Sequence, residues 1–246
     1  MDAPPIPPED GARTSREAGG LRAFAEIAAV MLVMPAFGYL GIVIFGFDFS
    51  DQVKGSELLL VKCVEVPLSL LALAALLWTR GERFSDLGWR FPRAHTGSDL
   101  RRGLGAMLPL LLLAAGVSTA LKIFDLDSHL PFVMDSTGEV LALMTAGILA
   151  GGISEEIMFR GFVFRRLERS IAPGSKRGTV QAALITSIAF AMLHAYEGPA
   201  AVGAIFVVAV GLQVLYLVSG RRLLAPMVCH ALFNSVQIGL LASASA

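Results

Sequence analysis

Charged residues are scarce in this sequence. Only 16% of its 246 residues are Asp, Glu, Lys or Arg, whereas 55% are hydrophobic, and the mean hydropathy is +0.68. Soluble domains carry about 25% charged residues, so the composition excludes an ordinary water-soluble globular protein. A lipid bilayer is the solvent that suits such a chain.

Cysteine is also rare, and familiar zinc motifs are missing. Cys63 and Cys229 lie in apolar runs on different predicted helices, which argues against a disulfide and against a zinc finger. No His-Glu-x-x-His motif occurs, so a conventional zincin metalloprotease is excluded. No internal repeat of fixed period is present, and a single bundle is expected.

Long hydrophobic runs are what the sequence has in abundance. A membrane-spanning helix needs about 20 apolar residues, and seven runs qualify. They are residues 23–47, 58–79, 103–121, 140–164, 179–196, 200–218 and 223–241. The expected fold class is therefore all-α, a polytopic bundle of about seven transmembrane helices that occupies residues 23–246. Residues 1–22 are rich in Pro and Gly and mixed in charge, which predicts a disordered tail.

The basic residues indicate how the bundle is oriented. If the N-terminus is cytoplasmic, sixteen Lys and Arg residues fall in the inner segments, and only Lys54 and Lys122 fall outside. This distribution satisfies the positive-inside rule at every loop. The sequence thus predicts a multi-pass protein of the cell (inner) membrane with its N-terminus in the cytoplasm.

The fourth run contains three charges that need compensation. A charge at the centre of a membrane helix costs about 2.5 to 3.5 kcal/mol on insertion scales. Glu156 and Arg160 are four residues apart, so they share a helix face and can pair. Glu155 points about 100° away from Glu156, onto a face where Gly151 and Gly152 leave room for water, a substrate or another helix. A purely structural polar cluster is the competing interpretation.

Two further runs carry polar groups at helical spacing. His194 follows Phe190 by four residues, and Asn234 follows His230 by four. Each group is costly alone in a membrane, and the groups satisfy one another only by converging with Glu155.

Convergence of these groups would suit hydrolysis of a peptide bond. A carboxylate and an imidazole can deprotonate a water, while a second imidazole and a carboxamide can donate to the oxyanion that forms. Glu155, His194 and His230 are equally a plausible set of ligands for a catalytic zinc ion. Other nucleophiles fit worse, because Ser154 lacks a Gly-x-Ser-x-Gly setting and Cys229 points about 100° away from His230.

The three elements together resemble a known family. Residues 155–160 (EEIMFR) fit Glu-Glu-x-x-x-Arg, residues 190–194 (FAMLH) fit Phe-x-x-x-His, and residues 230–234 (HALFN) fit His-x-x-x-Asn. In this respect the chain is similar to the CPBP intramembrane proteases, also called the CAAX prenyl protease type II or Abi family. The resemblance extends from about Val140 to the C-terminus, so a catalytic core is expected at about 140–241.

The resemblance implies a role for each residue. Glu155 and His194 would activate water, and His230 and Asn234 would stabilise the oxyanion. Glu156 and Arg160 would hold the site together. The expected partner is a membrane-associated protein or peptide substrate, not a nucleic acid. For the cofactor, a divalent metal such as zinc and a metal-free glutamate mechanism both stay open, and the oligomeric state is not predicted.

Two other functions compete with proteolysis. One is a non-catalytic immunity or scaffold protein of the same fold. The other is a proton-coupled transporter, although the symmetric broken helices of such proteins are missing. A protease is expected to open to the cytoplasmic side. His194 would then lie near the outer end of its helix, unless that helix begins well below the membrane surface, as we expect, or the cavity is deep.

Overall fold

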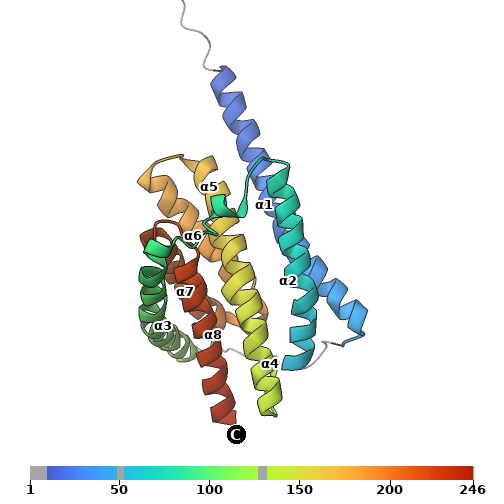
Figure 1. Cartoon of the computed structure of the whole chain (residues 1–246). Helices are drawn as coiled ribbons and strands as arrows, with labels where there is room; N and C mark the ends of the chain where they lie inside the picture. Colours follow the sequence, from blue (N-terminus) through green and yellow to red (C-terminus); the bar gives the residue numbers. More distant parts are fainter. Residues whose placement is uncertain (1–9, 49–52, 127–131, 246) are drawn as a thin grey trace, which may run out of the picture.

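The structure is a bundle of long helices (Figure 1). It is a computed structural model, and it describes residues 10–48, 53–126 and 132–245. The expected all-α membrane bundle is confirmed. In chain order the helices are α1 (Asp10–Phe45), α2 (Gly55–Trp78), α3 (Arg93–Lys122), α4 (Thr137–Gly147), α5 (Phe164–Ile171), α6 (Lys176–Met192), α7 (Pro199–Val218) and α8 (Leu224–Ser245), with a π-helix, η2 (Ile148–Val163), between α4 and α5. Two short 3-10 helices, η1 (Phe84–Leu87) and η3 (Ala195–Glu197), and two strands, β1 (Val53–Lys54) and β2 (Phe132–Val133), lie in the connections.

Six of the helical segments are long and apolar enough to cross a membrane. They are Gly20–Phe45, Gly55–Trp78, Arg93–Lys122, Thr137–Ile171, Pro199–Val218 and Leu224–Ala244. The remaining predicted span, 179–196, corresponds to α6, which has only 17 residues. The N-terminal boundary also differs, because α1 already begins at Asp10. Residues 1–9 of the predicted tail lie outside the described residues, and the division into tail and bundle stays a prediction.

The centre of the bundle is one continuous rod of α4, η2 and α5, residues Thr137–Ile171. Its first turn is capped by Ser136, whose hydroxyl accepts from the backbone N–H of Glu139. Between Ile148 and Val163 the backbone adopts the wider π form, and the N–H of Phe164 still bonds five residues back to Phe159. π-Helical turns are rare and often occur at functional sites.

Small residues bring this rod close to α8. A side chain at Gly152 would come within 2.8 Å of the Ala231 methyl group, and one at Gly147 would come within 3.3 Å of Cβ of Asn234. Such contacts are typical of small residues at membrane-helix interfaces. Gly147 and Gly152 therefore serve helix packing.

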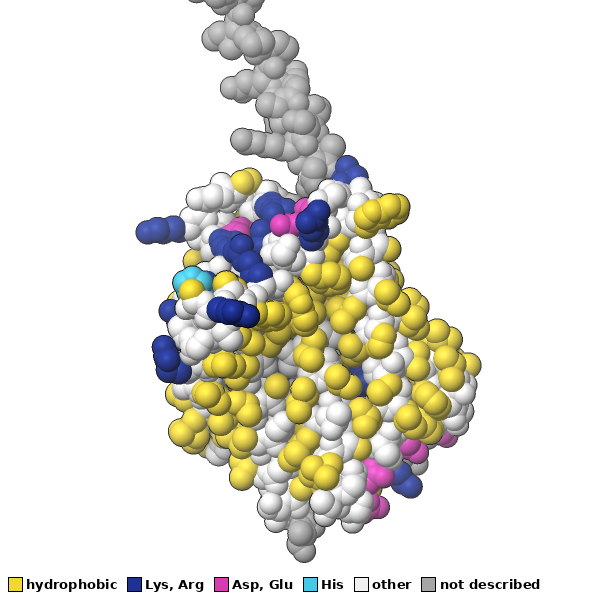
Figure 2. Space-filling model, viewed as in Figure 1, with side chains coloured by type: hydrophobic (Ala, Val, Ile, Leu, Met, Phe, Trp, Pro, Cys, Tyr) yellow, Lys and Arg dark blue, Asp and Glu magenta, His cyan; other side chains and the backbone are white. Residues whose placement is uncertain are grey.

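The two ends of the bundle differ in charge. The arginine end consists of the connections 79–92, 172–175 and 219–223 with the adjoining helix turns, and the strand end consists of β1, β2 and the adjoining starts of α2 and α4. Lys and Arg side chains gather at the arginine end in Figure 2, near the N-terminal helix. Figure 1 places α5 and the start of α6 beyond the ends of α3 and α8 on that side. The α5–α6 region thus projects beyond its neighbours at the arginine end, and that this end is cytosolic stays a prediction.

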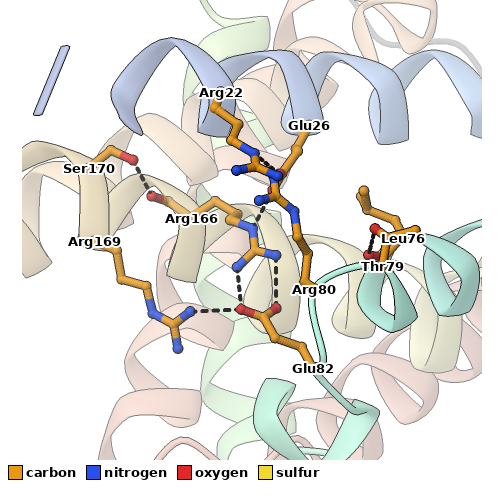
Figure 3. Close-up of polar contacts among 9 residues, drawn as sticks. All are labelled: Arg22, Glu26, Leu76, Thr79, Arg80, Glu82, Arg166, Arg169 and Ser170. Carbon is orange, nitrogen blue, oxygen red and sulfur yellow. Dashed lines mark hydrogen bonds and ion pairs between the residues drawn. The ribbon is translucent and has the colours of Figure 1, made fainter. Parts of the chain in front are cut away.

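Ion pairs tie the arginine end together (Figure 3). Arg166 on α5 bonds to Glu26 on α1 at 2.8 Å and to Glu82 in the α2–α3 connection at 2.9 and 2.8 Å. Arg80 also pairs with Glu26, and Arg169 bonds to Glu82 at 3.2 Å. The hydrogen bonds from Arg166 hold the pKa of Glu82 below its usual value. Several of the predicted inner arginines are therefore structural.

Candidate active site

A pocket of about 450 Å³ lies between α2, α4, η2, α7 and α8. Its walls are mainly apolar, and it is of the size of a small-molecule or peptide side-chain site. Glu155, His194, His230 and Asn234 all line it. The structure thus brings the four predicted groups to one cavity, from three separate parts of the chain.

The two neighbouring glutamates lie in different surroundings. Glu156 is fully buried, and its Oε1 accepts from Nη1 of Arg160 at 3.0 Å and from Nδ1 of His230 at 2.7 Å. The predicted pairing of Glu156 with Arg160 is confirmed. Glu155 is only half-buried and faces the pocket, where its carboxylate makes no hydrogen bond to another described residue. That carboxylate is therefore available to hold a water or a substrate group.

Arg160 is buried and is held by its two terminal nitrogens and by an aromatic ring. Its Nη2 donates to the backbone oxygen of Ala209 at 3.3 Å, and its guanidinium lies 4.6 Å from the centre of the Phe190 ring. Only 1% of Arg160 is exposed. A buried arginine that is paired, hydrogen-bonded and stacked is rigid, so it fixes the position of Glu156 and, through it, of His230.

His194 lies in the turn after α6 instead of in a membrane span. The helix ends at Met192, and the chain then turns through η3 to Gly198, whose φ of 93° suits glycine, before Pro199 begins α7. The ring of His194 packs against Phe190, with centroids 4.9 Å apart. Since α6 ends before His194, the turn after this helix places His194 in the wall of the same pocket as Glu155.

Hydrogen bonds define the tautomers of both histidines. Nδ1 of His194 lies 2.9 Å from the backbone oxygen of Phe190, which can only accept, so Nδ1 carries the proton and Nε2 is left with a lone pair. Nδ1 of His230 likewise donates to Glu156. For His230 to donate from Nε2 as well, its ring must carry a second proton.

Asn234 and His230 converge on Gly151. A side chain at Gly151 would come within 2.4 Å of Nδ2 of Asn234 and 3.0 Å of Nε2 of His230. Asn234 also donates to the backbone oxygen of Gly147 at 3.3 Å, which orients its amide and leaves a second N–H. Glycine at 151 therefore keeps open the space that these two polar groups face.

The predicted zinc ligands do not form a metal centre in this structure. Among the residues that it describes, no three His, Cys, Asp or Glu side chains are grouped so that they could hold a metal ion. Nδ1 of both histidines is engaged, which leaves Nε2 of each for another partner. Glu155, His194 and His230 are thus not grouped as a three-ligand site in this structure, and metal dependence stays a prediction.

One charged pair in the pocket wall escaped the sequence analysis. Lys62 on α2 lines the pocket and bonds to Glu65 at 2.7 Å. Glu65 is buried against Gly38 of α1, where a side chain would come within 2.7 Å of its carboxylate. Both residues lie within the predicted span 58–79, and charges at that depth are themselves a signal of a functional cavity. The sequence signal for Lys62 and Glu65 is that both charges lie inside a predicted membrane span.

The pocket extends toward the strand end. Along α8 it is lined from His230 to Leu241, about 16 Å at 1.5 Å per residue. Val53 of β1 and Phe132 of β2 complete its far wall. The expected opening to the cytoplasmic side stays a prediction, since the lining residues show how far the pocket extends along α8 and not where it opens.

The segment of the chain that contains the site matches a known protein family. Residues 137–236 match the family model described as type II CAAX prenyl endopeptidase Rce1-like. The matched segment contains all six predicted site residues, so the resemblance to the CPBP/CAAX protease family that the motifs indicate is confirmed. The match supports a CAAX-type intramembrane endopeptidase. Neither a curated protein nor a solved structure matches the chain.

Proposed function

We propose that the protein is an intramembrane endopeptidase that hydrolyses a peptide bond of a membrane-associated protein or peptide through an activated water. The observation that carries this proposal is the convergence of Glu155, His194, His230 and Asn234 on one apolar pocket, together with the family match over the same segment.

The hydrogen bonds suggest a catalytic or positioning role for each residue of the site. His194 presents Nε2 as a proton acceptor, and Glu155 has a free carboxylate, so these two groups hold and deprotonate the water. The second amide N–H of Asn234, and Nε2 of a doubly protonated His230, donate to the oxyanion. Glu156 and Arg160 act through His230 as positioning residues.

Replacement of Glu155 tests this division. In purified protein, Glu155→Gln and His194→Ala should each lower kcat/KM for a membrane-tethered reporter by about 10² to 10⁴-fold, the usual contribution of an acid–base group. Ser154→Ala is the matched control, since this neighbouring hydroxyl is buried without a partner among the described residues. Unchanged turnover in the Glu155 and His194 variants, or a loss in the Ser154 variant, would refute the assignment.

The substrate and the metal need separate measurements. Comparing membrane peptides in cells that carry the wild type or Glu155→Gln should reveal fragments that only the wild type produces. Elemental analysis of active protein then reports whether zinc accompanies activity.

A further inference from the structure

A second cavity, the basic cleft, lies at the arginine end and apart from the candidate active site. It has a volume of about 600 Å³ and is lined by Arg90, Phe91, Pro92, His95 and Arg222. The first three of these residues end the α2–α3 connection, His95 lies in the first turn of α3, and Arg222 lies in the α7–α8 connection. Ligand sites in proteins have volumes of about 300 to 1,000 Å³, so the basic cleft can hold a headgroup-sized molecule.

The two connections that frame the basic cleft are fixed to each other. The backbone N–H of Leu223 donates to the backbone oxygen of Gly88 at 3.1 Å. The hydroxyl of Tyr216 donates to the backbone oxygen of Leu87 at 3.2 Å. Gly88 has a φ of 96°, which suits glycine, and a side chain there would meet the backbone of Arg221. The basic cleft is therefore part of the packed fold.

Arg222 is a fixed cation in the wall of this cleft. Its Nε and Nη2 donate to the two carboxylate oxygens of buried Asp99 at 2.6 and 2.8 Å, and 12% of its side chain is exposed. A guanidinium carries five N–H groups in a planar fork, so three of them are not used by Asp99. A planar fork of this kind matches the geometry of a phosphate group.

Arg90 and His95, in contrast, have no protein partner for their side chains. Both are exposed, and neither side chain forms a hydrogen bond or an ion pair with another residue that the structure describes. The carboxylates closest in the sequence are engaged elsewhere, since Asp86 accepts from the backbone N–H of Arg83 at 2.8 Å and Asp99 accepts from Arg222. The basic cleft thus lacks an anion from the protein that would neutralise Arg90.

The surroundings of the basic cleft are those of the lipid headgroup layer. The rings of Trp89 and Phe91 meet edge to face with centroids 5.3 Å apart, and 44% of Phe91 is exposed. Such aromatic residues are enriched where membrane meets water. From there α3, one of the membrane spans, carries exposed leucines at a spacing of four residues, Leu100, Leu104 and Leu108. Figure 2 shows a broad hydrophobic surface directly below the Lys and Arg side chains.

From the unneutralised Arg90, the fixed Arg222 and the adjoining leucine stripe, we propose that the basic cleft binds the phosphate group of an anionic phospholipid. The phosphate accepts hydrogen bonds from Arg90, His95 and Arg222, and the acyl chains lie along the leucines of α3. Basic pockets between membrane helices are known to bind such headgroups. The lipid site is separate from the proposed peptidase site and does not depend on that activity.

Quenching of Trp89 fluorescence by brominated lipids measures this binding. The chain has two tryptophans, so Trp78→Phe leaves Trp89, which packs against Phe91 in the wall of the cleft, as the only reporter. The purified full chain in detergent is titrated with brominated phosphatidylglycerol, which is anionic. Brominated phosphatidylcholine, which is zwitterionic, is the matched lipid.

Two variants in this background remove cleft groups from different elements, so that failure of one to fold leaves the other. They are Arg90→Gln in the α2–α3 connection and His95→Ala on α3. Arg83→Gln is the matched control, because Arg83 is exposed in the same connection, lies outside the cleft lining and carries the same charge as Arg90.

Phosphatidylglycerol should quench Trp89 at lower concentration than phosphatidylcholine. Arg90→Gln should raise the phosphatidylglycerol concentration for half-maximal quenching about fivefold, the usual contribution of one basic residue at an anionic membrane surface. His95→Ala should shift it in the same direction, and Arg83→Gln should shift it by less than about twofold, because at that position only long-range charge is lost. Equal quenching by the two lipids, or equal shifts in the Arg90 and Arg83 variants, would overturn the proposal.

Inorganic phosphate distinguishes a lipid headgroup from a soluble ligand of the same chemistry. Sodium phosphate and sodium chloride are added at equal ionic strength to protein that is saturated with phosphatidylglycerol. Both salts should reduce quenching to the same extent, through screening. Complete displacement of the lipid by phosphate and not by chloride would assign the basic cleft to free phosphate and would contradict the lipid assignment.

Discussion

The half of the bundle near the arginine end and the half near the strand end are built from similar helices but have different roles. Toward the arginines the rod of η2 and α5 packs into a dense core of Phe159, Phe162 and Phe164, with Tyr216 against them. Toward the strands the same rod borders a pocket of about 450 Å³. One part of this rod therefore packs into the core and stabilises the fold, and another part lines the pocket.

The boundary between the halves passes between two adjacent residues. Glu156 belongs to the packed half, where its Oε1 accepts from Arg160 and His230, and Glu155 belongs to the hollow half. Identical side chains one position apart thus face a structural and a chemical environment. What separates their roles is their surroundings and not their chemistry.

The largest expected difference in stability between the two halves comes from replacing Glu156 and Glu155, one at a time, by alanine. Glu156→Ala leaves Arg160 buried without its carboxylate, and breaking such a pair costs about 3 to 5 kcal/mol. Glu155→Ala removes a half-buried group without such a pair and should leave stability nearly unchanged. Thermal unfolding of both variants in one detergent measures the difference. Equal losses would mean that the boundary is not where the structure places it.

A second pair of variants compares the halves along a single helix. Leu77 on α2 is packed in the core with 1% exposed, whereas Leu58 on the same helix lines the pocket. Leu77→Ala should cost about 2 to 5 kcal/mol because it leaves a cavity. Leu58→Ala widens existing space and should change the unfolding free energy by at most about 0.5 kcal/mol. A large loss at Leu58 would show that the strand half is packed in solution.

Filling the hollow half should reduce activity more than it reduces stability. In Gly151→Ala the new methyl would press on Nδ2 of Asn234 and Nε2 of His230, and such overpacking costs about 1 to 3 kcal/mol. Reporter cleavage should fall by a larger factor than the folded fraction does. Gly116→Ala on α3 is the control, since no atom lies within 4 Å of the added carbon. This variant should retain both reporter cleavage and the folded fraction. Full activity in the Gly151 variant would contradict the site.

Much of this arrangement could be predicted from the sequence. The spacing of four residues predicts the bond between Glu156 and Arg160, and the cost of lone polar groups in lipid predicts that Glu155, His194 and Asn234 converge. The first prediction depends only on the geometry of one helix. The second depends on the cost of polar groups in lipid, and both can be judged from the sequence.

Other features lie beyond that reasoning. Periodicity tells which residues share a face, but not whether the space in front of the face is filled, so it could not predict how far the pocket extends toward the strand end. The π form of residues 148–163 adds no signature to hydrophobic spacing. His194 was assigned to a span because the apolar run continues past Met192, although the helix stops there. Lys62 and Glu65 were overlooked because a strongly apolar run surrounds them.

The smallest effect concerns the ion pairs of the arginine half. Arg166 lowers the pKa of Glu82, so the pairing stabilises the fold above the ordinary glutamate pKa of 4.5 and is lost as the pH falls through the lower folded value. Glu82→Gln should cost about 1 kcal/mol at neutral pH, as for a partly exposed pair. Below the folded pKa the variant and the wild type should unfold at the same temperature, because the protonated glutamate no longer pairs. A difference that persists in acid would mean that Glu82 acts through packing, and the arginine half would then owe none of its pH dependence to this residue.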